Sequence, residues 1–171
     1  MKIKILNYKK EFQIINNSEV VLETKKPKWY SSEINFYYNN KHYEIKKNSF
    51  WSISRTIFVL EKPIGKIDFN FMKEDVIRLK KKNYTYNEYT LKKENVGKWY
   101  SSKKKYVLNK KDLSPVLTIH YDIKFWESSK EDISVTFNDE PSTDFVLLVC
   151  SLFLMRQKLS VENSASATVG Y

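Results

Sequence analysis

FVLLVCSLFLM, at residues 145–155, is an unbroken apolar run near the C-terminus of a chain that otherwise alternates between polar and apolar residues. A helix needs roughly 18 to 20 apolar residues to cross a bilayer, so this run is too short to span one. It is nevertheless apolar on every helical face, and a helix of that kind has to be enclosed by protein. We therefore expect the preceding strands to wrap around it.

The sequence around this run predicts a helix at about residues 143–159. Pro141 ends the preceding segment, and Ser142 or Thr143 can cap the first free amides of the helix. Acidic residues before the run and basic residues after it suit the two ends of the helix dipole. Small polar residues follow, so residues 160–171 are expected to form a flexible polar tail.

Short alternating runs, broken by Asn, Ser, Lys and Pro, fill the chain from residue 2 to about residue 137 and predict β-strands. Residues 34–38 and 41–45 form a predicted hairpin, because Asn39 and Asn40 accept the positive φ that a two-residue turn requires. The other expected strands are the opening run from residue 2 and residues 11–15, 19–24, 54–61, 64–71, 75–81, 84–92, 104–109, 115–121 and 132–137.

The size of the helix selects the architecture. A helix with its side chains is about 10 to 12 Å across, and an eight-stranded barrel is already filled by its own side chains. A sandwich with the helix at one end would leave an apolar face of a few hundred square ångströms in water. We therefore predict a mainly β fold: a closed antiparallel barrel of about 12 strands that encloses one hydrophobic C-terminal α-helix. Residues 1–159 make a single domain.

The composition excludes several classes of protein. Only three glycines occur in 171 residues, which rules out glycine-rich dinucleotide and P-loop signatures. Cys150 is the only cysteine, so no internal disulfide can form, and its place within the apolar run predicts a buried, inert thiol. The N-terminal residues alternate rather than form the apolar core of a signal peptide. The chain is expected to be cytoplasmic and to lack a transmembrane segment.

The charge of the chain is +10 and unevenly distributed. Residues 1–121 hold 26 basic and 12 acidic residues, whereas residues 122–144 hold two basic and seven acidic ones. The basic part could attract phosphate-bearing partners through its long-range field. A chain rich in Lys, Asn, Ile and Tyr with only three Arg is also what an AT-rich genome produces, so both interpretations remain open.

No residue pattern points to catalysis or to a metal. His42 and His120 lie on predicted strands without a ligand at metal-binding spacing. Asp122 follows His120 by two residues and could share its strand face, as a general base and its orienting group would, but no nucleophile accompanies them. We therefore expect a non-enzymatic protein with no cofactor and no metal.

The arrangement of about twelve strands and one threading helix resembles the tubby-like superfamily, which includes tubby C-terminal domains, LURP-one-related proteins and phospholipid scramblases. The resemblance rests on the strand series, the Pro-Ser-Thr-Asp helix start at 141–144, the apolar helix, and the segments at 29–32 (WYSS) and 64–67 (IGKI), which are similar to parts of small bacterial members. It implies a stable barrel, and the better-studied members bind phosphoinositides or act at membranes.

The pentapeptide Lys-Trp-Tyr-Ser-Ser occurs at residues 28–32 and again at 98–102. Two related halves of a barrel would explain the repetition, and so would coincidence in a Lys- and Ser-rich chain. Its Trp-Tyr pair could anchor at a membrane interface or pack within the protein.

Two lysine runs are the candidate ligand contacts, Lys80-Lys81-Lys82 and Lys103-Lys104-Lys105, and tyrosines adjoin both. Each lysine near an anionic membrane contributes about 1 kcal/mol, so the leading hypothesis is peripheral binding of anionic phospholipid headgroups, such as phosphoinositides, at the inner membrane face. The alternatives are that the lysines protect solubility and strand edges, that the Lys and Tyr surface binds nucleic acid, or that the barrel is a protein-interaction scaffold, for which the acidic residues 122–144 are the hint.

Overall fold

Twelve β-strands followed by one α-helix make up the protein. A computed structural model describes residues 1–6, 11–28, 31–49, 51–70, 74–81, 83–96, 103–124, 130–138 and 144–168. The strands are β1 (Lys2–Leu6), β2 (Glu11–Asn16), β3 (Glu19–Lys25), β4 (Ile34–Tyr38), β5 (Lys41–Lys46), β6 (Arg55–Val59), β7 (Lys62–Asp68), β8 (Asp75–Lys80), β9 (Tyr86–Asn95), β10 (Lys104–Lys110), β11 (Pro115–Lys124) and β12 (Lys130–Phe137). The helix is α2 (Phe145–Thr168). All twelve predicted strands are present, which confirms that part of the sequence interpretation.

Each strand pairs with its neighbours in sequence, and the sheet closes where β1 pairs with β12. Every pair of neighbouring strands is antiparallel. An up-and-down sheet can close into a barrel with every pair antiparallel only when its number of strands is even, as it is here. The closing contact is short in the described residues: Lys2 pairs with Ser134, Ile3 pairs with Ile133, and Met1 exchanges two backbone hydrogen bonds with Val135. β3 and β4 are also joined by only two residue pairs in the described part of the chain. The predicted closed barrel is confirmed.

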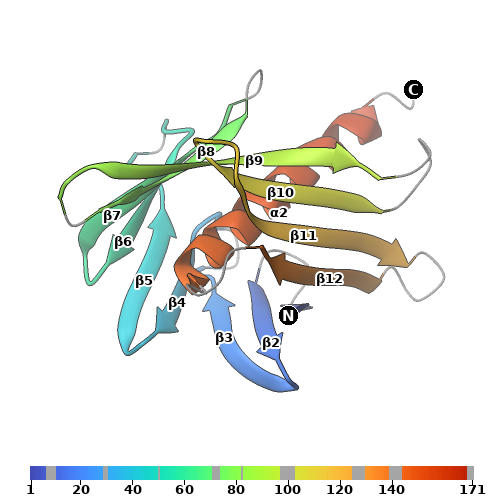
Figure 1. Cartoon of the computed structure of the whole chain (residues 1–171), viewed down its shortest axis with the longest axis horizontal. Coiled ribbons are helices and arrows are strands. Elements are labelled where there is room, and N and C mark those ends of the chain that lie inside the picture. Colours follow the sequence, from blue (N-terminus) through green and yellow to red (C-terminus); the bar gives the residue numbers. More distant parts are fainter. Residues whose placement is uncertain are drawn as a thin grey trace.

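α2 runs through the ring of strands and emerges at one end of the barrel (Figure 1). All the residues from Phe145 to Met155 are buried, as the uniformly apolar sequence predicted. Alternate strand residues point inward against the helix, for example Phe12 and Ile14 of β2. Burying one large apolar side chain stabilises a fold by about 1.5 to 3 kcal/mol, so this helix is the centre of the core.

The ends of α2 differ from the prediction. Asp144 caps the helix, since its Oδ1 accepts hydrogen bonds from the amides of Val146 at 3.0 Å and Leu147 at 3.1 Å. The helix therefore begins at Phe145 instead of residue 143, and the predicted caps Ser142 and Thr143 lie outside the described residues. At the other end the helix continues to Thr168, whereas a polar tail was expected from residue 160. No Gly or Pro occurs between Phe145 and Gly170, so the helix meets no helix-breaking residue before Gly170.

Two-residue turns with positive φ join β4 to β5 and β6 to β7. Asn39 and Asn40 have φ values of 49° and 57°, as predicted for the β4–β5 hairpin. The β6–β7 turn lies at Leu60 and Glu61, with φ values of 46° and 65°, although the sequence predicted a strand through residue 61. Pro63 explains the shift, because it pairs with Phe58 next to a bulge in β7, where the register skips Ile64 and a residue without an amide hydrogen is tolerated inside a strand.

Gly65 is expected to tolerate no side chain. A Cβ at this position would lie 2.4 Å from the carbonyl oxygen of Arg78 and 2.9 Å from Cδ2 of Leu79. Gly65→Ala should lower the free energy of unfolding by about 1 to 3 kcal/mol, because the contact with backbone cannot relax without moving β8. Urea denaturation measures the effect, with Ser134→Ala, at an exposed position of β12, as the control. Equal stability of the Gly65 and Ser134 variants would contradict the close approach.

Cys150 is expected to be unreactive in the folded protein. The residue is fully buried, and burial raises the pKa of its thiol well above the usual value. A thiol-specific disulfide reagent at pH 8 should therefore leave the native protein unmodified and label one thiol per chain after denaturation, because only the thiolate reacts. Rapid labelling without denaturant would show that the helix leaves the barrel readily.

Candidate functional site

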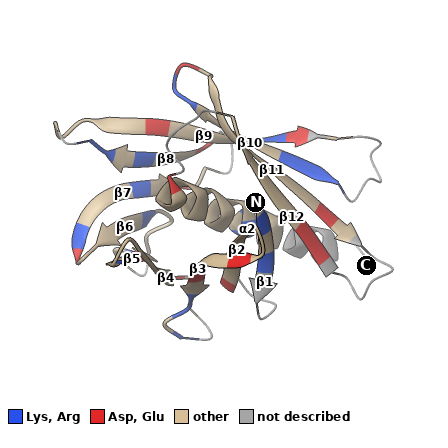
Figure 2. Ribbon diagram, turned by 60° about the horizontal axis from the view of Figure 1, so that its bottom comes forward, with Lys and Arg blue, Asp and Glu red and all other residues tan. Residues whose placement is uncertain are grey.

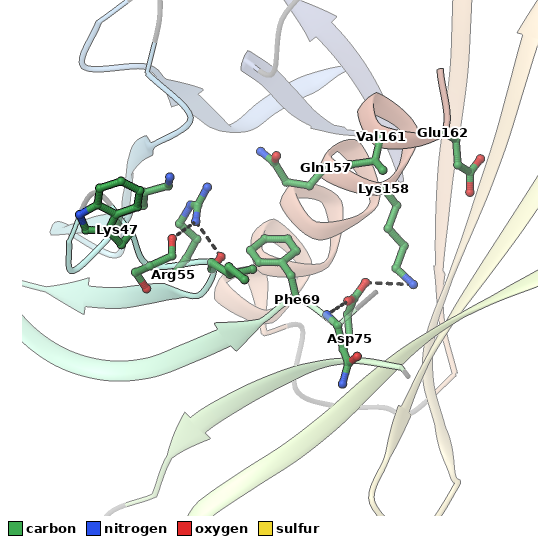
Figure 3. Close-up of a pocket in the computed structure, with 12 residues that line it drawn as sticks. Lys47, Arg55, Phe69, Asp75, Gln157, Lys158, Val161 and Glu162 are labelled. Atoms are coloured by element: carbon green, nitrogen blue, oxygen red, sulfur yellow. Dashed lines mark hydrogen bonds and ion pairs between the residues drawn. The ribbon is translucent and has the colours of Figure 1, made fainter. Parts of the chain in front are cut away.

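A pocket of about 510 Å³ opens at the end of the barrel where α2 emerges. Its wall is formed by Arg55, at the start of β6, by Phe69, which follows β7, and by Asp75, at the start of β8. α2 contributes Gln157, Lys158, Val161 and Glu162, and the loop between β5 and β6 contributes Lys47, Trp51, Ser52 and Ile53. We call this cavity the Arg55 pocket and the end of the barrel that holds it the exit end (Figure 3).

Arg55 is the most unusual residue of the pocket, because its side chain is only 7% exposed. Nη1 donates hydrogen bonds to the carbonyl oxygens of Ile53 at 2.8 Å and Ser54 at 3.3 Å, and Nη2 donates to Oγ of Ser32 at 3.2 Å. The guanidinium also lies over the ring of Phe69, with 5.4 Å from Cζ to the ring centroid. These contacts hold the group in one orientation.

No carboxylate forms an ion pair with Arg55 among the residues that the structure describes, and its Nε is buried without a hydrogen-bond acceptor there. Burial lowers the pKa of the guanidinium, and the negative charge of Glu33 opposes that shift only in part. The side chain stays protonated at neutral pH, because the guanidinium of arginine is not deprotonated in proteins. The wall of the pocket therefore carries a desolvated positive charge.

The two carboxylates of the pocket are already engaged. Asp75, which is only 3% exposed, accepts a hydrogen bond from the amide of Asn70 at 2.7 Å and pairs with Lys158 at 2.9 Å. This ion pair joins α2 to β8, and Figure 3 shows Lys158 reaching from the helix toward Asp75. The charge of Asp75 is thus balanced within the protein rather than directed at Arg55.

Glu162 is the second carboxylate, and it joins α2 to two strands. Its oxygens lie 2.8 Å from Nζ of Lys93 on β9 and 2.8 Å from Nζ of Lys104 on β10. Burial acts to raise the pKa of Glu162, but the hydrogen bonds from Lys104 and Lys93 outweigh it, and the pKa is lowered.

The rim of the pocket is apolar and exposed. Trp51 is 88% exposed, Ile53 is 59% exposed, and Val161 is 54% exposed. All three line the pocket beside the basic residues. An exposed tryptophan with aliphatic neighbours around a cationic pocket is typical of a surface that meets an amphiphilic partner.

The structure separates the two lysine runs that the sequence singled out. Lys80 lies opposite Tyr86 and Lys104 lies opposite Asn95, so the runs flank opposite ends of β9. A strand of ten residues spans about 30 Å. The second run lies at the exit end, where Lys104 pairs with Glu162, whereas Lys80 and Lys81 lie at the far end of the barrel. Lys82 falls outside the described residues.

Several of these lysines have contacts within the protein. Lys80 lies over the ring of Tyr84, at 4.6 Å from the centroid, and Lys105 pairs with Glu94 at 2.8 Å. Lys103, which is exposed, also takes part in an interaction within the protein. Blue and red segments are interspersed over the strands in Figure 2 rather than gathered on one of them. The five described lysines of the two runs therefore do not form one continuous surface.

His120 and Asp122 lie two residues apart on β11 and share one face of that strand, as the sequence suggested, whereas His42 lies on β5. His42 packs its ring against Tyr37 at 4.9 Å, and His120 is exposed on β11. Within the described ranges, no group of three or more His, Cys, Asp or Glu side chains could hold a metal ion. Burial raises the pKa of Tyr106 and of Tyr121, so both phenols remain protonated.

Two sequence features can be placed only in part. The second Lys-Trp-Tyr-Ser-Ser pentapeptide, residues 98–102, lies outside the described residues, and so do Trp29 and Tyr30 of the first and Glu127, Asp139 and Glu140 of the acidic stretch. In the described part of the chain, no helical segment combines the length and the hydropathy needed to span a bilayer.

Arg55 was not identified from the sequence. It is one of only three arginines in the chain, and it begins a strand whose first residue would usually be exposed. Its partners come from residues 32, 53 and 69, which are distant in the sequence or belong to a loop. The only local signal is that rarity, which alone does not reveal burial.

Comparisons of the chain with protein-family models, with curated proteins and with solved structures find no match in any of the three. The fold and the Arg55 pocket therefore carry the functional argument by themselves.

Glu162 should give the protein an acid-dependent contribution to stability. Its pKa is lowered in the folded state, so its stabilising effect is complete above the pKa of an unfolded-chain glutamate, about 4.3, and is lost as the pH falls through the lowered value. Partly exposed ion pairs are worth about 1 kcal/mol or less each. Glu162→Gln should therefore lower the urea midpoint at pH 7 and have a smaller effect at pH 3.

Glu19→Gln, at an exposed residue of β3, serves as the control for this measurement and should leave the midpoint unchanged at both pH values. If Glu162→Gln has the same effect at pH 7 and pH 3, the ion pairs with Lys93 and Lys104 do not stabilise the helix end.

Proposed function

We propose that this protein is a tubby-like, non-enzymatic barrel that binds anionic phospholipid headgroups peripherally through its exit end, at the cytoplasmic face of a membrane. The observation that carries the proposal is the combination of an exposed apolar rim, formed by Trp51, Ile53 and Val161, with the cationic wall of the Arg55 pocket. Tryptophan favours the headgroup region, because its ring is apolar and its N–H can still donate a hydrogen bond.

Electrostatics favour the exit end over the far end. The surface field of an anionic membrane decays within a Debye length, about 8 Å at physiological ionic strength. Lys103 and Lys105 would lie near a membrane that meets the rim, whereas Lys80 and Lys81 would lie about 30 Å away, several Debye lengths from it. The second lysine run can therefore support binding at this surface, and the first contributes little.

A second candidate is single-stranded nucleic acid at the far end. Tyr84 is 77% exposed and Tyr86 is 54% exposed, and both lie beside Lys80 and Lys81. Exposed aromatic rings next to cations can stack unpaired bases and contact phosphates. The two candidates use different lysine pairs, which makes them separable by mutation.

Flotation with phosphatidylcholine vesicles, with and without phosphoinositide, tests the lipid proposal. The protein should float with the anionic vesicles only, and less well as the salt concentration rises. Lys103→Gln/Lys105→Gln should weaken binding by roughly tenfold, because each lysine near the membrane is worth about 1 kcal/mol and part of that is offset by pairing within the protein. Trp51→Ser should also weaken it.

Lys80→Gln/Lys81→Gln is the matched control, since it removes the same charge from the far end and should leave flotation unchanged. The same two double variants are titrated with a single-stranded oligonucleotide. Equal failure to bind anionic and neutral vesicles would remove the lipid proposal, and salt-dependent oligonucleotide binding that only the far-end variant loses would establish the second candidate.

A further inference from the structure

Arg55 has hydrogen-bonding capacity that the protein does not use. A guanidinium has five N–H donors, and the described residues offer carbonyl oxygens to Nη1, one hydroxyl to Nη2 and no acceptor to Nε. Such a charge is costly in a protein interior, since the negative charge of Glu33 offsets the desolvation only in part and no carboxylate forms an ion pair with Arg55 among the described residues. The pocket beside it is where a compensating anion could lie.

The guanidinium is also held in place before any ligand arrives. Phe69 supports one face of it, and Phe69 in turn packs against Phe153 of α2, with 6.5 Å between the ring centroids. The loop carbonyls and Ser32 fix its plane. An arginine that is already oriented loses little side-chain entropy on binding, which favours affinity for a planar or tetrahedral oxyanion.

The charge balance of the pocket favours an anion. Three basic residues line it, Lys47, Arg55 and Lys158, against the two carboxylates of Asp75 and Glu162. Asp75 is paired with Lys158, and Glu162 is paired with Lys93 and Lys104, which do not line the pocket. Because the charge of Arg55 is delocalised over its three nitrogens, it attracts an anion in the pocket even though Nε is covered.

The volume and the rim limit the size of the ligand. About 510 Å³ is within the range of small-molecule pockets, and it accommodates a phosphorylated headgroup but not the chains of a lipid. Trp51, Ile53 and Val161 at the rim would meet the apolar part of the ligand outside.

We propose that the Arg55 pocket is a binding site for a single phosphate monoester group, held against the Arg55 guanidinium with the rest of the ligand leaving past Trp51. This inference rests on the proposed membrane function and names its specific contact. The same phosphate group could belong to a lipid headgroup or to a free metabolite, and the two sources are separated by comparing soluble and membrane-bound probes.

Calorimetric titration with sn-glycerol 3-phosphate, at constant ionic strength maintained with sodium chloride, tests the site. Wild-type protein should bind the probe saturably. Ile53→Glu places a negative charge at the rim and should weaken binding at least about tenfold. Leu60→Glu is the matched control, because Leu60 is also 59% exposed but lies in the β6–β7 turn at the far end, and it should bind like wild type.

Arg55 itself is tested with two variants. Arg55→Gln should abolish saturable binding, and Arg55→Lys, which keeps a charge but not the planar donor array, should bind more weakly than wild type. Arg78→Gln is the control, since Arg78 forms its ion pairs with Asp68 and Glu88 outside the pocket. Thermal melting of each variant identifies a folding defect, and the Ile53→Glu and Leu60→Glu pair decides the question if the Arg55 variants do not fold.

The outcomes distinguish this inference from the proposed function. Saturable binding of the soluble probe together with Ile53-sensitive flotation supports both. Flotation without binding of the soluble probe, or probe binding that Ile53→Glu and Arg55→Gln leave unchanged, overturns the pocket assignment and leaves the lipid proposal standing. Pocket-dependent probe binding without flotation supports a soluble phosphorylated ligand and removes the membrane function.

Discussion

The fold depends on the requirement that an all-round apolar helix be kept from water. The segment from Phe145 to Met155 has no polar face with which it could lie on a protein surface, and every residue of it is buried. A sheet that covers one side of such a helix leaves the other side exposed, whereas a closed ring covers all sides at once. The inward side chains of the strands fill the space between sheet and helix. The barrel therefore shields the helix from water, and the helix fills the interior of the barrel.

Closure of the ring is local and short compared with the rest of the sheet. β1 and β12 share two residue pairs, and so do β3 and β4, whereas β11 and β12 share eight. These short pairings contribute few backbone hydrogen bonds, so packing of side chains in the shared core also helps to hold the ring there. Ile3 of β1 and Ile133 of β12 belong to the same buried cluster as the helix, which joins the two ends of the sheet through the core.

Local sequence patterns predicted the elements of the fold, whereas contacts between distant elements determined the site. Alternation of polar and apolar residues predicted all twelve strands, and Asn39 and Asn40 predicted a hairpin, because both signals are contained in a few consecutive residues. The two lysine runs are separated because β9 lies between them, and the distance depends on the length and register of that strand. The positions of the lysines in the sequence do not reveal that register. Burial of Arg55 depends on Ser32, Phe69 and the loop before β6, which approach one another only in the folded barrel.

At the exit end of the barrel, the ion pairs that anchor α2 also determine the charge around Arg55. Asp75 and Glu162 tie α2 to β8, β9 and β10, and in doing so they keep two carboxylates from neutralising Arg55. A buried arginine without an ion pair lowers stability relative to an apolar residue of similar volume, so packing alone does not account for Arg55. Local departures of this kind are found mainly where a protein binds or reacts. An anion that binds there would repay the desolvation of Arg55 and stabilise the folded state in proportion to its occupancy, which links ligand binding to the end of the barrel where the helix emerges.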